Sequence, residues 1–153
     1  MSNLKLYGTP LAINKIASNN MNEINLTKNE TKSPVKKLVE NYIHFFISTD
    51  RAVVELRPLL SETFKFSGPL GTFTTRDSFL EDVKRDALSI TDIKIHHILV
   101  EGQHASALYE VYTSDPEVKK LLISEWFTTE KNQITSIFSI YDATDVKDLF
   151  SRI

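Results

Sequence analysis

The stretch DIKIHHILVEGQHASALYEVYTSDPEVKKLLISEWFTTEKNQITSIFSIY, residues 92–141, decides the fold of this chain. Apolar and polar side chains alternate with a period of two through most of it, which is typical of β-strands that bury one face. The alternating segments are 93–100, 104–112, 121–128 and 134–141. Turn-forming residues separate them at Glu101-Gly102, Ser114-Asp115-Pro116 and Lys131-Asn132. The stretch therefore predicts four strands of an antiparallel meander.

Helical spacing of apolar residues replaces the strand pattern on the N-terminal side of this stretch. The strongest helix is predicted over residues 34–47, where the hydroxyl of Ser33 can cap the first turn. A second, shorter helix is expected over 53–60 with Asp50 as its cap, and a third over 76–88. The first two helices together are predicted to form a helical hairpin.

A short β-hairpin is predicted between the second and third helices. The segments 63–66 and 72–74 consist mainly of threonine and phenylalanine, and Gly68-Pro69-Leu70-Gly71 between them suits a tight turn. Beyond the last strand, residues 145–150 are expected to form a short closing helix.

The first 32 residues differ in composition from the rest of the chain. They contain seven asparagines, and their apolar residues are sparse and follow no period. We expect a mobile leader at 1–32, and the alternative is an arm that docks on a partner. The folded domain is accordingly predicted to span residues 33–153.

Composition and charge exclude several classes of function. Apolar residues make up 41% and charged residues 25% of the 153, as in a soluble protein with one hydrophobic core. The 18 basic and 20 acidic side chains are scattered, so no basic stripe for nucleic acid is expected. The chain has no cysteine, which excludes disulfides and thiolate zinc sites. Without an apolar run of about 20 residues or a signal peptide, we predict a cytoplasmic protein that does not bind membranes.

Strand pairing predicts which side chains converge on one face of the sheet. With the second turn centred on residues 117–118, Glu110 lies opposite Glu125, and the same face carries His97 and Asp142. Its apolar members are Ile93, Ile95, Leu108, Tyr112, Ile123, Phe127, Phe138 and Ile140. The same register pairs Ile93 with Glu110, His97 with Ser106, and Glu125 with Phe138. Two opposed glutamates on an apolar wall repel if both ionise, so at least one pKa is expected to rise, as general acid–base chemistry requires. The alternative is that one glutamate lies at the solvent rim or that the register slips.

The opposite face of the sheet is also too apolar to face water. Its predicted members are Ile98, Val100, Ala105, Ala107, Tyr109, Val111, Leu122, Trp126, Ile137 and Tyr141. One face of the sheet can pack against the helices and the other against a second subunit, so we predict a homodimer. Adjacent strand residues point to opposite faces, so His96 and His97 are not expected to bind a metal together, and no cofactor is predicted.

The order of these elements resembles that of the nuclear transport factor 2-like superfamily, in particular its SnoaL-like and ketosteroid isomerase-like branches. The resemblance covers about residues 34–150 and is carried by the order of segments rather than by a strict motif. The segments are Tyr42-Ile43-His44-Phe45-Phe46 before Asp50, Phe64 to Gly71, Leu108-Tyr109-Glu110, Glu125-Trp126-Phe127, Asn132-Gln133-Ile134 and Ile140-Tyr141-Asp142. It implies an α+β, cystatin-like cone in which three N-terminal helices pack on a curved antiparallel sheet around a pocket.

The resemblance to steroid isomerases implies roles for two residues. Those enzymes hold a carbonyl oxygen between a tyrosine on the first helix and a protonated acid on the penultimate strand, and the matching positions are Tyr42 and Glu125. Their base position falls near Gly68, which has no side chain. Direct transfer of that mechanism is therefore not expected.

The resemblance to limonene epoxide hydrolase is also incomplete. Glu110 resembles one of the acids of that enzyme. The arginine and the second acid that it requires fall near Leu108 and Ser139. That activity is therefore not predicted either.

The leading hypothesis is a SnoaL-like protein whose pocket binds a small, largely apolar molecule. Acid–base chemistry of isomerase, cyclase or hydratase type is assigned to Glu125 and Glu110, assisted by Tyr42, His97 or Asp142. The alternative is a noncatalytic ligand-binding or dimerisation module in which the same pocket is only a ligand site or a filled core. For Tyr42 itself, the alternative is a core tyrosine whose hydroxyl finds one partner.

Overall fold

The computed structural model of the chain describes residues 33–47, 53–85, 89–144 and 146. Its helices are α1 (Pro34–Phe45), α2 (Val53–Leu56), the 3₁₀ helix η1 (Arg57–Leu59) and α3 (Arg76–Arg85). Its strands are β1 (Leu60–Gly68), β2 (Gly71–Phe73), β3 (Ile90–Glu101), β4 (His104–Thr113), β5 (Lys120–Glu130) and β6 (Gln133–Ile140). This order confirms the predicted helices, hairpin and meander. The leader at 1–32 and the Asp50 cap lie outside the described residues, as does the closing helix at 145–150 apart from Val146.

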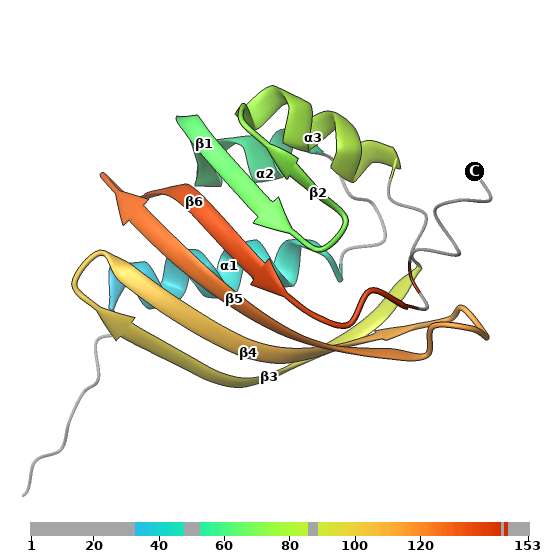
Figure 1. Cartoon of the computed structure of the whole chain (residues 1–153). Coiled ribbons are helices and arrows are strands. Elements are labelled where there is room, and N and C mark those ends of the chain that lie inside the picture. Colours follow the sequence, from blue (N-terminus) through green and yellow to red (C-terminus); the bar gives the residue numbers. More distant parts are fainter. Residues whose placement is uncertain (1–32, 48–52, 86–88, 145, 147–153) are drawn as a thin grey trace, which may run out of the picture.

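The strands form one curved sheet in the order β2-β1-β6-β5-β4-β3 (Figure 1). The meander β3 to β6 is antiparallel, as predicted. β1 lies beside β6 and runs parallel to it, with Phe66 opposite Ile137. The sheet is therefore mixed, and the expectation of a wholly antiparallel sheet is wrong at this one junction. Parallel neighbours need a long connection, and here α3 and the first three meander strands supply it.

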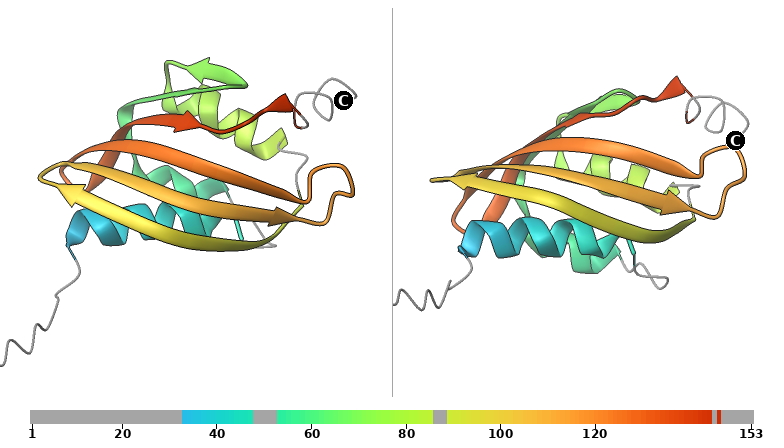
Figure 2. Two further views of the ribbon diagram at one scale, coloured as in Figure 1. Left: turned by 60° about the horizontal axis from the view of Figure 1, so that its bottom comes forward. Right: turned by 90° about the horizontal axis from the view of Figure 1, so that it is seen from below.

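α1 lies along the concave face of the sheet (Figure 2). Pro34 occupies its first turn, where a missing N–H costs no hydrogen bond. Ser33 makes no side-chain hydrogen bond to the helix, so the predicted hydroxyl cap is wrong. Its carbonyl instead accepts a hydrogen bond from the backbone N–H of Lys37 at 3.0 Å. The helix is held mainly by its apolar stripe, which packs on the sheet.

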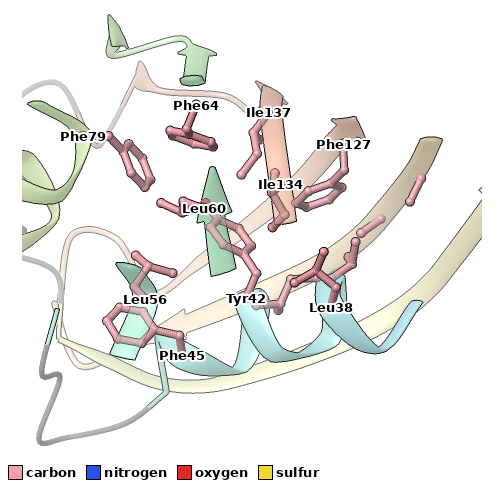
Figure 3. Packing of buried hydrophobic residues seen from close by; sticks show 14 of the residues in the cluster. Leu38, Tyr42, Phe45, Leu56, Leu60, Phe64, Phe79, Phe127, Ile134 and Ile137 are labelled. Atoms are coloured by element: carbon pink, nitrogen blue, oxygen red, sulfur yellow. The ribbon is translucent and has the colours of Figure 1, made fainter. Parts of the chain in front are cut away.

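The hydrophobic core fills the space between the helices and this concave, inner face (Figure 3). Leu38 and Tyr42 extend from α1 toward Phe127, Ile134 and Ile137 of the sheet. The other core residues labelled in the figure are Phe45, Leu56, Leu60, Phe64 and Phe79. The core therefore joins the hairpin and all three helices to the meander.

The observed register between β4 and β5 differs from the predicted one. Glu125 lies opposite Ala107 rather than Glu110, a shift of three residues (110 − 107). An odd shift moves every side chain to the other face, because successive strand residues alternate. The cause is the turn after β4, which is centred near Pro116, earlier than predicted. Asp115 Oδ1 accepts two backbone hydrogen bonds that shape this turn, at 2.8 and 3.2 Å.

An irregularity in β3 changes the pairing of that strand with β4. The turn pairs Glu101 with His104, so His97 lies opposite Leu108 rather than Ser106, and the register shifts only beyond it, between His97 and Ile95. His97 therefore shares the outer face with Leu108, since cross-strand partners point the same way. The bulge puts Ile95 and His97 on opposite faces, and the sequence marks it with two consecutive polar residues, His96-His97, where the alternation breaks.

A second irregularity lies between β5 and β6. The register shifts between Thr128 and Thr129, so Glu125 lies opposite Ser139 rather than Phe138. Because successive strand residues alternate, this shift of one residue moves each β6 side chain to the face opposite to the one predicted.

These shifts decide which predicted face assignments hold. Five residues predicted together do share the inner face, namely Ile93, Ile95, Ile123, Glu125 and Phe127. Six others predicted with them lie on the outer face instead, namely His97, Leu108, Glu110, Tyr112, Phe138 and Ile140. The inner face also carries residues that were predicted for the opposite face, namely Ala105, Ala107, Tyr109, Val111 and Ile137.

Candidate functional site

A cavity of about 560 Å³ lies between the helices and the inner face of the sheet. Its polar lining groups are Tyr42, Asp82, Tyr109, Glu125, Ser139 and Tyr141. Its other lining residues are apolar or aromatic, apart from Gly71. A cavity of this size with few polar groups is typical of a site for a small, largely apolar molecule.

Glu125 is a buried carboxyl in the wall of this cavity, with 4% of its surface exposed. The hydroxyl of Tyr109 donates a hydrogen bond to Glu125 Oε2 at 2.8 Å. Ser139, directly opposite on β6, also hydrogen-bonds to the carboxyl. Burial raises the pKa of Glu125 from 4.5 to about 7, and the two hydrogen bonds offset part of the rise. The carboxyl therefore exchanges its proton near neutral pH.

Two buried tyrosines, Tyr42 on α1 and Tyr109 on β4, line the cavity with Glu125. Burial raises the pKa of both hydroxyls well above 10.0, and the nearby charge of Glu125 raises them further. The ring of Tyr42 packs edge-on against Phe46 and Phe127, with centroids 5.4 and 5.6 Å apart. Both hydroxyls therefore keep their protons at neutral pH and act as hydrogen-bond donors.

Three phenylalanine rings form the wall on the side of the hairpin and α3. Phe66 stacks on Phe79 with centroids 5.1 Å apart, and Phe73 lies 5.8 Å from Phe79. A Cβ atom at Gly68 would lie 2.9 Å from the ring of Phe66 and 3.4 Å from Ser139 Cβ. The position at which a steroid isomerase carries its base therefore has room for a side chain only if Phe66 moves.

Glu110 lies on the outer face of the sheet. Lys120 Nζ donates a hydrogen bond to its Oε1 at 2.9 Å, and the hydroxyl of Tyr112 donates one to its Oε2 at 2.7 Å. His96 Nε2 lies 3.3 Å from the same Oε2. The hydrogen bonds from Lys120 and then Tyr112 lower the pKa of Glu110 from 4.5 to about 2. Glu110 is therefore ionised in an outer-face polar cluster, and its predicted opposition to Glu125 is wrong.

His97 and Asp142 do not line the cavity with Glu125. His97 is exposed on the outer face, on the same side as its neighbour His96, so the expectation that these two histidines diverge is wrong. Asp142 Oδ1 accepts hydrogen bonds from the backbone N–H and hydroxyl of Thr144, at 3.0 and 2.6 Å. Of the five predicted site residues, the structure brings only Tyr42 and Glu125 together.

Four polar groups of the cavity were missed as site residues, namely Asp82 of α3, Tyr109, Ser139 and Tyr141. Tyr109 lies on β4, Ser139 on β6 and Tyr141 directly after β6, and these are the strands whose faces were exchanged in the predicted register. The correct faces would have identified these three from the same sequence.

The described residues contain no cluster of metal ligands and no helix of membrane-spanning length. Within those residues, no group of three or more His, Asp or Glu side chains is close enough together to hold a metal ion. No helix in the same ranges is long and apolar enough to cross a bilayer. The polar side chains that line the cavity carry carboxyl and hydroxyl groups.

Comparisons with protein-family models and with curated proteins find no match. Solved structures do match. An NTF2-like protein of unknown function from Cytophaga hutchinsonii has a TM-score of 0.62 and 22% identity, over 79% of this chain and 98% of that one. A proposed ketosteroid isomerase from Kribbella flavida has a TM-score of 0.62 and 15% identity, over 71% and 78% of the two chains. An LEH-like epoxide hydrolase of M. tuberculosis has a TM-score of 0.62 and 12% identity, over 78% and 90%.

These likenesses define the class of fold. The chain has the α+β cone fold of the NTF2-like superfamily, as the sequence resemblance predicted. Similarity at 12 to 22% identity concerns the fold and carries no activity with it. The function has to be argued from the cavity.

Proposed function

We propose that the cavity binds a small, largely apolar molecule and that Glu125 exchanges a proton with it as a general acid or base. The observation that carries this proposal is a buried carboxyl in an apolar cavity, held by Tyr109 at 2.8 Å, with a pKa raised by burial to about 7. A group that titrates near the working pH is the most effective proton donor and acceptor. The reaction class is an isomerisation, cyclisation or hydration.

The two buried tyrosines support this chemistry as donors. Tyr42 lines the same cavity as Glu125 and keeps its proton, so it can stabilise negative charge that develops on a ligand oxygen. Tyr109 orients the Glu125 carboxyl through its hydrogen bond. The proposal therefore keeps Tyr42 and Glu125 from the predicted set and adds Tyr109 as a positioning residue. Glu110, His97 and Asp142 receive no catalytic role.

The names of two fold relatives are compatible with acid–base work in such a cavity. One is a proposed ketosteroid isomerase and the other an LEH-like epoxide hydrolase. Gly68 replaces the base of the first pattern, so Glu125 has to serve as the proton-exchanging group here.

The alternative, a noncatalytic ligand-binding or dimerisation module, is favoured by a different observation. Large apolar side chains are exposed on the outer face of the sheet, among them Trp126 at 56% and Phe138 at 52%. We therefore also propose a homodimer formed through this face.

Hydrogen–deuterium exchange at ligand carbon atoms tests the catalytic proposal without a known substrate. A panel of cyclic ketones, enones and epoxides is incubated with the protein in D₂O, and NMR follows deuterium incorporation and turnover. Glu125→Gln should reduce the rate at least about 100-fold while ligand binding changes little. Glu110→Gln, the same substitution on the outer face, is the matched control and should keep the wild-type rate. Binding without wild-type turnover would favour the noncatalytic alternative, and equal rates in Glu125→Gln and wild type would exclude Glu125 as the acid–base group.

A further inference from the structure

The cavity is lined by aromatic side chains from four different parts of the fold. They are Tyr42 of α1 and Phe46 directly after it, Phe66 and Phe73 of the hairpin, Phe79 of α3, and, from the meander, Tyr109 of β4 and Tyr141 directly after β6. Aromatic rings attract cations through the negative potential of their faces. Walls of this composition therefore suit a ligand that is apolar and also carries positive charge.

The charged groups of the cavity have only one sign. Its titratable side chains are Glu125, Asp82 and the three tyrosines, and none of the lining residues in the described ranges is Lys, Arg or His. Asp82 is on α3 and exposed, whereas Glu125 is buried deep in the sheet wall. A buried carboxylate without a cation beside it is costly, so a cationic ligand group would stabilise its ionised form.

We propose that this cavity selects small apolar molecules that carry a basic amine, with the ammonium group bound against the Glu125 carboxylate. This inference rests on the ligand-binding half of the proposed function and does not require proton transfer to a carbon atom. A neutral ligand of the same shape would leave the carboxylate unpaired. An anionic ligand would add a second negative charge beside it.

Proton balance predicts how the binding depends on pH. Below about 7 the free protein holds a proton on Glu125, so binding of an ammonium ion must release that proton to solvent. The groups that face Glu125 are Tyr42 from α1, Tyr109 from β4, Ser139 from β6 and Tyr141 beyond it. The two buried tyrosines stay neutral there, so the released proton comes from Glu125. Amine affinity should therefore rise with pH up to about 7, by as much as about tenfold per pH unit, and then level off.

A matched series of three probes tests the inference. 2-(1-Naphthyl)ethylamine, 2-(1-naphthyl)ethanol and 1-naphthylacetate share one apolar body and differ in the charge of the head group. Isothermal titration calorimetry at pH 6 and pH 8 measures their affinities for the full chain. The amine should bind at least about tenfold more tightly than the alcohol at pH 8, and the acetate most weakly. At pH 6, titration in two buffers of different ionisation enthalpy should detect release of a proton with the amine alone.

Variants and outcomes separate this inference from the proposed function. Glu125→Gln should remove the preference for the amine while alcohol binding persists, and the outer-face control Glu110→Gln should change neither. If the alcohol binds as tightly as the amine, the ligand site stands and amine selectivity is overturned. If none of the three probes binds, both the site and the selectivity are overturned. If Glu125→Gln does not fold, the wild-type protein alone tests the inference, through the pH dependence of amine affinity and the proton released on binding. Amine binding that shows neither a pH dependence nor proton release would overturn the inference.

Discussion

A single residue, Glu125, carries most of the chemistry that we propose for the cavity. It is buried at 4% exposure, its Oε2 accepts a hydrogen bond from Tyr109, and burial raises its pKa to about 7. Glu110 shows the opposite environment. Hydrogen bonds from Lys120 and Tyr112 lower its pKa to about 2. Two glutamates of one sheet thus differ in role because one faces the helices and the other faces outward.

Glu125→Gln is expected to change how the free energy of unfolding depends on pH. Between about 4.5, the ordinary pKa, and about 7, the pKa in the folded protein, the native state holds a proton that the unfolded chain has lost. Wild-type stability should therefore decrease as pH rises through this window, by about 3 kcal/mol, and stay level above it. The variant lacks this titration, so its stability relative to wild type should rise by the same amount.

Urea unfolding of both proteins between pH 4 and pH 8 measures this difference. Glu62→Gln, at an exposed position of β1, is the control and should follow wild type at every pH. A difference between Glu125→Gln and wild type that does not change with pH would contradict the raised pKa.

At the scale of the elements, the sequence was sufficient for the order of helices and strands but not for the register. The period of two located each meander strand, and the glycine at 102 located one turn. The turn after β4 contains six residues between the strand ends, and its centre cannot be counted from the alternation. Each of the two bulges coincides with two consecutive polar residues, His96-His97 and Thr135-Ser136, a break in the alternation that the predicted register did not use.

The alternation within β4 would have given a better prediction of the site than strand pairing did. Ala105, Ala107, Tyr109 and Val111 form an uninterrupted apolar series, and the positions between them include Ser106 and Glu110. That series marks the buried face without any assumption about partners, and it puts Tyr109 in the cavity wall. Tyr42 could be predicted because the apolar face of a helix is set by the period of its own sequence and does not depend on pairing with another segment.

The turns of the meander provide a prediction at this scale. Gly102 has a φ of 58°, in the left-handed region that costs a residue with a Cβ about 1 kcal/mol. No atom lies within 4 Å of a Cβ built there, so Gly102→Ala should lose only this conformational term. Asn132 has a φ of 61° in the last turn, so Asn132→Gly is the matched reverse change and should be neutral or slightly stabilising. Chemical denaturation measures both, and an unchanged stability of Gly102→Ala would contradict the assigned turn.

At the scale of the whole molecule, both faces of the sheet are apolar, but among the described residues only the inner face is covered by helices. The helices cover the inner face (Figures 1 and 2). On the outer face, the exposed large apolar side chains are Leu99, Leu122, Trp126, Phe138 and Ile140. Trp126 lies directly opposite Phe138, and both line a groove of about 820 Å³. Apolar surface gathered in this way is typical of an interaction site.

We expect this outer face to pair with itself in a twofold dimer, in which each copy contributes the same patch. Replacing Trp126 by Glu should weaken self-association at least about 100-fold, because it adds a charge at the centre of an apolar contact. Analytical ultracentrifugation of wild type and variant over a range of concentrations measures the change. Val54→Glu, at a side chain that is 71% exposed on α2, is the matched control and should still dimerise.

The chain has one tryptophan, so its fluorescence reports the same event independently. Emission of Trp126 should move to shorter wavelength as wild type associates, because the ring leaves water for an apolar contact. The shift should follow the dimer fraction from ultracentrifugation and persist in Val54→Glu. A wild-type protein that remains monomeric at about 100 μM, with emission independent of concentration, would contradict the proposed dimer. Such a result would leave the exposed apolar side chains of the outer face, as the described residues present them, to contact a different partner.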